Sequence, residues 1–282
     1  MPDGGRDDDR IEDIFSEIES QWPEFLKRIR SKSALTFSEF SEAATFIVAL
    51  RVRVPAARDA AELFLAEGVR MTGLIMEANG DLPPPPPGLE EALKIENLTI
   101  SIDPHRSIHL MMDAIRGLGP IIDMMGYVIV HNETDTPYIT SDNPVVYFDP
   151  TVSSSSLRPY TISPEGPIMA FFPISSNLLL VGCSQYRESF LRNGITYSEE
   201  HDPTSVQKIN DLVARFAYRQ IYARDASSLE LALPFVETSP VPQFDTLPTD
   251  DGNILITRMI FGPRPVKPKW RPGRPLNVQG FA

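Results

Sequence analysis

The chain has 282 residues, of which 42% are hydrophobic and 23% charged, as in ordinary globular proteins. These values exclude collagen, coiled coil and wholesale disorder, and the length fits one large domain or two small ones. The formal net charge of -12 argues against a surface built mainly for nucleic acid, because phosphate binding needs clustered Lys and Arg. Only the stretch 258–274, with six bases and no acid, offers such a contact.

A cytoplasmic protein is expected from the segments that the sequence lacks. The lone Cys183 excludes an internal disulfide and a cysteine-based zinc site. The N-terminus has no basic region followed by an apolar stretch, so it does not resemble a secretory signal. No apolar run reaches the roughly 18 residues that a transmembrane helix needs. We therefore expect no membrane contact.

The first half of the chain is predicted to be helical. Thr36 and Glu39 form a capping box, and Pro55 should break the helix that they start. Gly80 is a fitting helix end, and the five prolines at 83–87 predict an exposed polyproline segment. Apolar residues at helical spacing predict helices over residues 11–29, 40–50, 63–75, 89–97 and 104–122.

The pattern changes to short β-rich runs near Gly126, with one later helix at 203–224 capped by Asp202. Helices followed by strands predict an α+β fold, in which an N-terminal helical layer packs on a mostly antiparallel β region. We expect a helical part (1–125), a β-rich part (126–261) and an extended tail (262–282), joined in one integrated domain. The predicted strands are 127–130, 137–140, 145–148, 168–172, 178–182, 229–233 and 254–260.

The most distinctive local feature is Ser141-Asp142-Asn143-Pro144, which we call the SDNP turn. In a structural interpretation, Ser141 and Asp142 accept hydrogen bonds from N–H groups two residues further on. In a functional interpretation, Asp142 and Asn143 project into a pocket, where they orient a substrate or hold a hard metal ion. Ser141, Asp142 and Asn143 are then the candidate catalytic residues, and Asp142 and Asn143 are candidate binding residues with Arg53.

The stretch YITSDNPVV at 138–146 resembles the signature of a bacterial family, domain of unknown function 4238. Shorter fragments agree in order over roughly residues 11–225: Ile-Glu at 11–12 and 18–19, Arg-Val-Pro at 53–55, the proline-led run 173–178, and Asn210 before 219–222. The resemblance supplies no known activity that could be carried over to this chain, and the cofactor stays unknown. Family members usually open with a His-x-x-Pro segment that this chain lacks; if that histidine is catalytic, we expect this chain to be inactive, truncated or differently started.

A weaker candidate for a metal site includes three polar residues that precede the SDNP turn in the sequence. His131, Glu133 and Asp135 would share one face of an extended strand, and with Asp142 they could hold a metal ion. We favour a solvent-facing loop and no metal.

Arg51 and Arg53 stand among apolar residues of a predicted helix, where an arginine must be paired or hold an anion. Arg53 beside Asp142 could be a structural ion pair or an anion-binding element, and the sequence leaves both open.

Two functions follow from these features. We slightly favour a non-catalytic protein that binds a protein partner or a small ligand, because common catalytic motifs such as GxSxG, HExxH and GxxxxGK[ST] are absent and proline-rich segments can dock on proteins. The alternative is a hydrolase-like or nuclease-like enzyme centred on Asp142 and Asn143. Substrate, cofactor and oligomeric state are not indicated.

Overall fold

The computed structural model describes residues 7–163, 166–226, 230, 234–235, 237–249 and 252–270. The predicted strand at 229–233 therefore lies largely outside the described residues, as does the part of the basic stretch beyond residue 270. The helices are α1 (Asp7–Ser20), α2 (Trp22–Arg30), α3 (Phe37–Arg53), α4 (Pro55–Asn79), α5 (Pro104–Asp123), α6 (Arg187–Asn193) and α7 (Pro203–Phe216), with short 3-10 turns at Ile95–Asn97 and Ser184–Tyr186.

The main sheet has five strands in the order β3-β4-β5-β1-β6, and every pair is antiparallel except β1–β6. Two further pairs, β2–β7 and β8–β9, stand apart from it. The strands are β1 (Gly126–Asn132), β2 (Thr140–Ser141), β3 (Val146–Phe148), β4 (Met169–Ser175), β5 (Leu178–Cys183), β6 (Thr196–Glu200), β7 (Ile221–Tyr222), β8 (Ser239–Thr249) and β9 (Gly252–Gly262).

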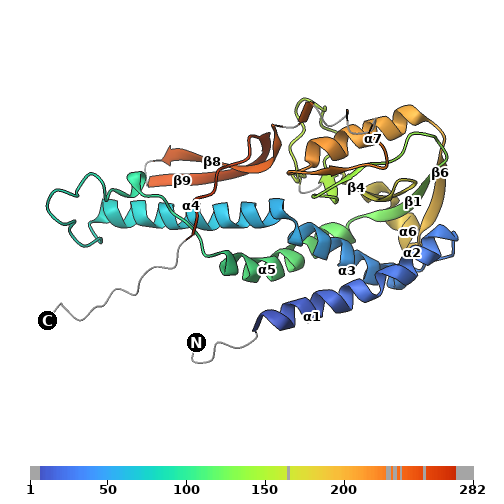
Figure 1. The fold of residues 1–282 in the computed structure, drawn as a ribbon, viewed down its shortest axis with the longest axis horizontal. Helices are drawn as coiled ribbons and strands as arrows, with labels where there is room; N and C mark the ends of the chain where they lie inside the picture. Colours follow the sequence, from blue (N-terminus) through green and yellow to red (C-terminus); the bar gives the residue numbers. More distant parts are fainter. Residues whose placement is uncertain are drawn as a thin grey trace.

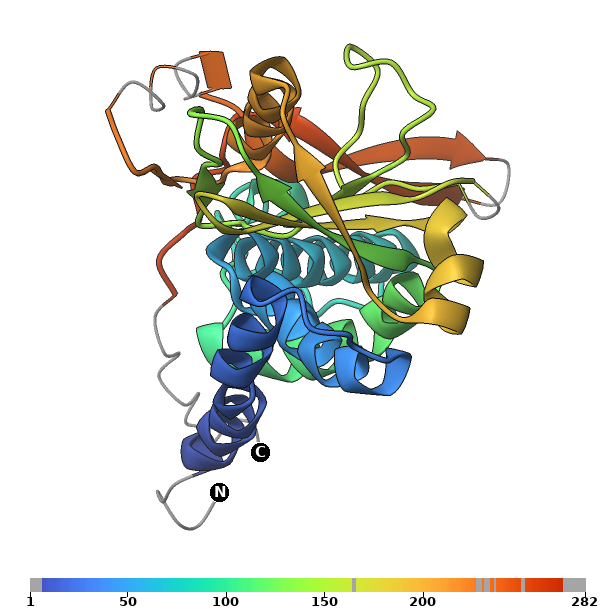
Figure 2. The ribbon, with the colours of Figure 1, turned by 90° about the vertical axis from the view of Figure 1, so that its right-hand side faces the viewer.

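The sheet is covered on both faces, which gives the α+β fold predicted from the order of elements. Figure 2 shows the N-terminal helices below the sheet and α7 above it. On the lower face, Phe25 and Phe40 from the helices pack with Ile129 of β1 in the largest core cluster. On the upper face, Phe216 of α7 packs with Leu179 of β5. Alternate strand residues serve the two faces, as the period of a β-strand requires.

The helix boundaries follow from local chemistry. Thr36 Oγ1 accepts a hydrogen bond from the Glu39 N–H, and the Glu39 carboxylate accepts one from the Thr36 N–H, which confirms the predicted capping box. Pro55 ends α3 and starts α4, with Val54 extended between them. Gly80 ends α4 at a φ of 74°, a left-handed conformation in which a Cβ would be strained.

Several predicted boundaries were wrong. The first predicted helix is two, because the chain breaks at Gln21 before Pro23. The predicted helix at 89–97 forms turns and one 3-10 turn. The late helix stops at Phe216, not at 224, because the following residues turn extended to pair β7 with β2. The predicted strand at 137–140 is reduced to β2. The hydrophobic pattern of the sequence did not predict strands β6 and β8 or the short helix α6.

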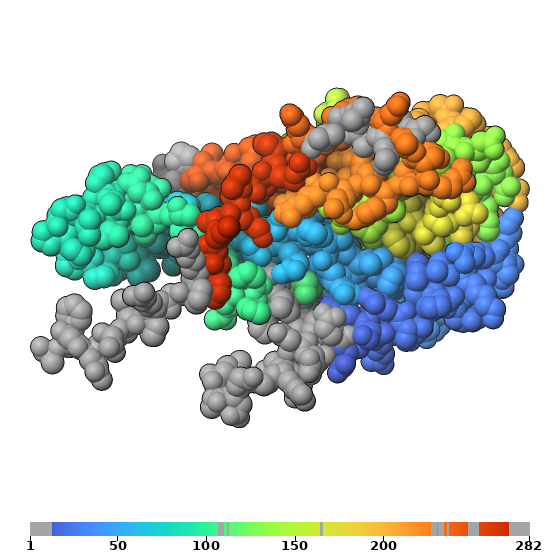
Figure 3. All heavy atoms as spheres, in the orientation of Figure 1, coloured from blue at the N-terminus to red at the C-terminus, as the bar shows by residue number. Residues whose placement is uncertain are grey.

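An arm extends from this body. It consists of α4, residues 80–99 and the β8–β9 hairpin, and Figure 1 shows the hairpin running alongside α4. Phe64 of α4 meets Phe244 of β8 edge to face, with ring centroids 5.4 Å apart. The five prolines at 83–87 are exposed, as predicted. Figure 3 shows residues 80–99 projecting at one end of the molecule and the segment after β9 crossing the middle. Within the described residues, no helix has the length and apolarity to span a membrane.

Candidate functional site

The Asp142 carboxylate binds the backbone that follows α7. Its Oδ1 accepts a hydrogen bond from the Tyr218 N–H and its Oδ2 accepts one from the Arg219 N–H, both at 2.9 Å. The Asp142 N–H in turn donates to the Gln220 carbonyl at 3.1 Å. Asp142 thus joins the SDNP turn to a segment 76 residues away in sequence. Both carboxylate oxygens have backbone partners.

The neighbours of Asp142 in the turn are also engaged. Ser141 Oγ accepts a hydrogen bond from the Asn143 N–H at 3.1 Å, which is the local turn predicted from the sequence. Asn143 is fully buried, and its Nδ2 donates to the Phe216 carbonyl at 2.7 Å and to the Tyr160 hydroxyl at 2.6 Å. Its Oδ1 is buried with no hydrogen-bond partner among the described residues.

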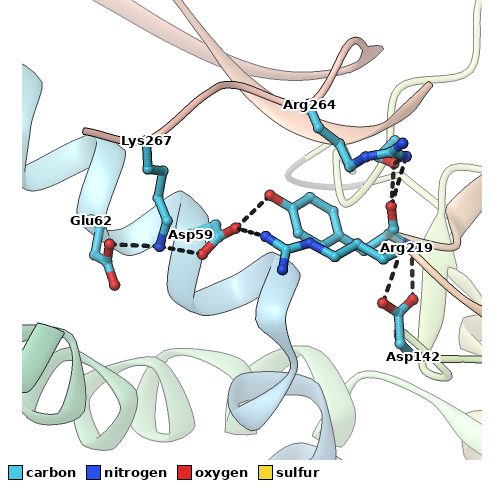
Figure 4. Close-up of polar contacts among 8 residues, drawn as sticks. Asp59, Glu62, Asp142, Arg219, Arg264 and Lys267 are labelled. Carbon is cyan, nitrogen blue, oxygen red and sulfur yellow. Dashed lines mark hydrogen bonds and ion pairs between the residues drawn. The ribbon is translucent and has the colours of Figure 1, made fainter. Parts of the chain in front are cut away.

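The segment held by Asp142 continues into an ionic network with the arm. Asp59, a buried carboxylate of α4, accepts hydrogen bonds from the Tyr218 hydroxyl at 2.7 Å and from the Arg219 guanidinium at 2.8 Å. Lys267 forms ion pairs with Asp59 and with Glu62 of α4. Figure 4 shows Asp59 between Lys267 and Arg219, with Asp142 on the far side of Arg219. Burial opposes the charge of Lys267, but bonding to both acids raises its pKa overall.

Arg264 closes this network from the chain's C-terminal part. Its guanidinium donates to the Tyr218 carbonyl at 2.9 Å and to Ser239 Oγ at 3.1 Å, and Ser239 Oγ itself donates to the same carbonyl at 2.8 Å. The sequence alone does not point to Asp59, Tyr218 or Arg264 as members of one site. Their only sequence signal was an acid on an apolar helix and a late basic stretch, which does not reveal contacts over such separations.

Arg53, a predicted binding residue, does not bond to Asp142. Its guanidinium forms an ion pair with Glu19 and lies 4.3 Å from the ring centroid of Phe15. The proposed Arg53–Asp142 ion pair was therefore wrong, because backbone N–H groups satisfy Asp142 instead. Arg51, two residues earlier, stacks on Tyr160 with its Cζ 3.7 Å from the ring centroid.

The weak metal candidates are separated by a turn. Strand β1 ends at Asn132, whose Oδ1 accepts hydrogen bonds from the N–H and hydroxyl of Thr134. His131, Glu133 and Asp135 therefore do not share one face of a continuous strand. His131 is half-buried, and this burial, with the positive charge of Lys32, lowers its pKa. Asp135 is exposed. In the described part of the chain no three His, Cys, Asp or Glu side chains gather as metal ligands.

Asn210 carries a second link of the same kind as Asp142. It is fully buried on α7; its Oδ1 accepts a hydrogen bond from the Ile139 N–H at 3.0 Å, and its Nδ2 donates to the Pro137 carbonyl at 2.9 Å. The amide thus supplies the hydrogen-bond partners of Ile139 and Pro137, while the Tyr138 N–H between them donates to the Ser176 carbonyl. This pairing explains why a polar residue stands on the apolar stripe of α7.

Three cavities lie away from the SDNP turn. One of about 340 Å³ opens between α7 and the loop after β3, and one of about 290 Å³ lies within that loop. A third, of about 260 Å³, lies between α2 and α3. The largest of these three is lined by apolar side chains such as Phe148 and Leu212 and by the basic residues Lys208 and Arg215.

The chain is thus an α+β protein in which a buried polar turn holds a helix end and an arm. It belongs to the family described as protein of unknown function (DUF4238), whose model matches residues 1–227, well over half of the chain. This match confirms the predicted family. The β8–β9 hairpin follows the matched residues. No curated protein and no solved structure matches the chain.

Proposed function

We propose that this protein is a non-catalytic interaction protein, whose arm binds an extended segment of another protein by adding it as a strand beside β9. The observation that carries the proposal is the open edge of β9 in the isolated β8–β9 hairpin. An unpaired strand edge presents a row of N–H and C=O groups to any extended chain.

The two edges of the hairpin differ in chemistry. Pro240, Pro242 and Pro248 occupy alternate positions of β8 and have no N–H to offer. Proline is tolerated where the N–H would point away from the ladder, so these positions lie on the outer edge of β8 and block it. The register pairs Pro242 with Met259, so residues of the same parity in β9 also face outward. β9 contains no proline, and its edge is open.

No other strand covers that edge in the described structure. The hairpin is a two-stranded sheet, and no backbone group outside it bonds to residues 253–261 among those described. α4 packs on β8, as the Phe64–Phe244 contact shows. The edge of β9 therefore keeps unpaired polar groups of the kind that partner strands bind.

The hairpin also presents an apolar face beside this edge. Leu247 is directly opposite Ile254 in the register, and Ile256 is the next residue on the same face. Their exposed fractions are 50%, 52% and 42%, respectively. Adjacent exposed apolar side chains on a strand pair are typical of a binding surface. An added segment that alternates apolar and polar residues would extend this face.

The SDNP turn supports the non-catalytic interpretation. Both Asp142 oxygens accept backbone hydrogen bonds, and the Asn143 amide nitrogen donates two. A general base or nucleophile needs a lone pair directed at substrate, so the hydrolase-like or nuclease-like alternative has less support. We place the protein in the bacterial cytoplasm, in keeping with the family resemblance and with Cys183 as a buried free thiol.

The test uses a pair of matched proline substitutions. Thr257 of β9 and Thr246 of β8 are both exposed and both at outward positions of their strands. Thr257→Pro removes an N–H from the open edge, whereas Thr246→Pro removes one from the edge that proline already blocks. A random peptide library is selected on the full chain, and the enriched peptides are tested by calorimetry with hydrogen exchange of β9.

We expect enriched peptides with alternating apolar residues that protect β9 amides from exchange. Thr257→Pro should abolish their binding, while Thr246→Pro should leave it within about twofold, a difference of less than about 0.5 kcal/mol. Equal loss in both variants, protection that maps elsewhere, or a selection without enrichment would each contradict the proposal.

A further inference from the structure

The body of the protein contains an arginine, Arg51, whose guanidinium forms no ion pair with a carboxylate among the described residues. Arg51 lies in the last turn of α3 and is half-buried, yet no hydrogen bond or ion pair joins it to any described residue. Its Nε is buried and unpartnered. Arg53, two residues further on in the same last turn of α3, has Glu19 as its counter-ion. A guanidinium with a buried Nε is best stabilised by an anionic partner, and among the described residues Arg51 contacts the face of Tyr160 instead.

An unsatisfied acceptor belongs to Asn143, whose amide bonds to the hydroxyl of the same tyrosine. The Tyr160 hydroxyl accepts a hydrogen bond from Asn143 Nδ2 at 2.6 Å, while Arg51 covers its ring. The carbonyl of Phe216 accepts from the same Nδ2, which fixes the orientation of the amide. Asn143 Oδ1 is therefore an acceptor, and it is buried in a residue of 0% exposure without a donor. Buried polar atoms of this kind require a missing partner.

Two phenol groups complete the cluster. The rings of Tyr147 and Tyr160 lie 4.9 Å apart, and both feel the charge of Arg51. Burial raises the pKa of Tyr160 to about 12, so its hydroxyl keeps a proton that it can donate. The Tyr147 hydroxyl has no hydrogen-bond partner among the described residues. Arg51, Asn143 and Tyr147 thus all neighbour Tyr160: Arg51 covers its ring, Asn143 bonds to its hydroxyl and the ring of Tyr147 lies beside it.

We propose that Arg51, Tyr147, Tyr160 and Asn143 form a binding site for a phosphate group that retains a proton. The guanidinium and the phenols donate to the anionic oxygens, and the P–OH group donates to Asn143 Oδ1. This site lies in the body, apart from the arm, and does not depend on the proposed protein partner. A bound phosphate that keeps one proton would supply the counter-ion for Arg51 and the hydrogen-bond donor for Asn143 Oδ1.

The acceptor makes the site selective among anions. Inorganic phosphate carries at least one proton at neutral pH, and a phosphomonoester, whose second pKa is about 6, can take one up in the site. Sulfate carries none and would place an oxygen against Asn143 Oδ1. The negative charge of Asp142, which is felt at Tyr160, acts in the same direction because it disfavours a fully deprotonated ligand. Selectivity for phosphate over sulfate is therefore the property that identifies this site.

The test measures the heat of binding of inorganic phosphate, sodium sulfate and O-phosphoserine to the full chain. Phosphate should bind saturably and sulfate at least about tenfold more weakly, the effect of one unmatched buried acceptor. Phosphoserine separates the sources: binding as tight as that of phosphate indicates a phosphomonoester ligand, and weaker binding indicates the free ion. Both outcomes support a phosphate site. Equal binding of sulfate would overturn it.

Arg51→Met and Arg53→Met make a matched pair on one helix turn. Arg51→Met keeps the side-chain length and removes the charge, and it should weaken phosphate binding at least about tenfold. Arg53→Met removes an arginine that already has a partner and should leave binding within about twofold. Tyr147→Phe should weaken binding by a smaller factor. Circular dichroism melting confirms that each variant is folded.

Equal affinity of Arg51→Met and the wild type would place any bound phosphate elsewhere and overturn the assignment. Absence of saturable phosphate binding to the folded wild type would overturn it as well.

Discussion

The Asp142 side chain accepts a hydrogen bond from the backbone N–H of Tyr218 at 2.9 Å, although the two residues are 76 positions apart. The Tyr218 hydroxyl then donates to Asp59 on α4. One tyrosine therefore links the SDNP turn to the arm through its two ends. The strong local pattern of the turn serves a long-range contact.

Substitution of Asp142 tests this contact. Asp142→Asn keeps one oxygen for the Tyr218 N–H and turns an amide NH₂ toward the Arg219 N–H, so it should cost about 1–2 kcal/mol of unfolding free energy. Asp142→Ala leaves both N–H groups without an acceptor and should cost roughly twice as much. Urea unfolding measures both. Asp135→Asn, at an exposed position, is the control and should stay near wild type. A stabilising Asp142→Asn would contradict the linking role.

Asn210 should be at least as sensitive. Asn210→Ala leaves the buried Ile139 N–H and Pro137 carbonyl without partners, so we expect a loss of about 2–5 kcal/mol in urea unfolding. Asn193→Ala on α6 removes an exposed amide and should change stability by less than about 0.5 kcal/mol. Similar effects at the two positions would show that the paired amide of Asn210 contributes little.

Glu39 gives the protein a specific acid sensitivity. Its hydrogen bond to Arg28, followed by those from Thr36, lowers the pKa of Glu39 from 4.5 to about 2. A carboxyl with a lowered folded pKa contributes stability above pH 4.5 and loses it as the pH falls toward 2. Glu39→Gln does not titrate, so its stability deficit at about pH 7 should shrink by about pH 3. A deficit that stays constant in urea unfolding at both pH values would argue against this assignment.

The helical part should not fold without the sheet. Phe25, Phe40 and Ile47 share one core cluster with Tyr127 and Phe172 of the sheet. A fragment of residues 1–125 would expose these side chains to water, so it should unfold without cooperativity or aggregate. Circular dichroism, urea titration and sedimentation test this. A monomeric fragment with a cooperative transition would show that 1–125 is a domain of its own.

The local elements could be read from the sequence because their causes are local. The Thr36–Glu39 box, the break at Pro55 and the end at Gly80 each depend on residues within one turn. The strands of the main sheet followed from β-rich runs, except β6, whose residues Thr196–Glu200 are mostly exposed and carry little apolar signal. The family was also evident from the sequence, since the pattern around 138–146 is itself local.

The partners of charged residues could not be read in this way. Arg51 and Arg53 look alike in sequence, yet Arg53 meets Glu19 and Arg51 meets Tyr160. Asp142 looked like a turn residue or a free functional acid, and it binds backbone groups beyond α7. Sequence determined most of the long helices, their ends and the apolar strands of the main sheet, because propensity and hydrophobic period act over a few residues. Only the tertiary structure decided which buried charges are satisfied, because that depends on chain segments brought together across tens to hundreds of residues.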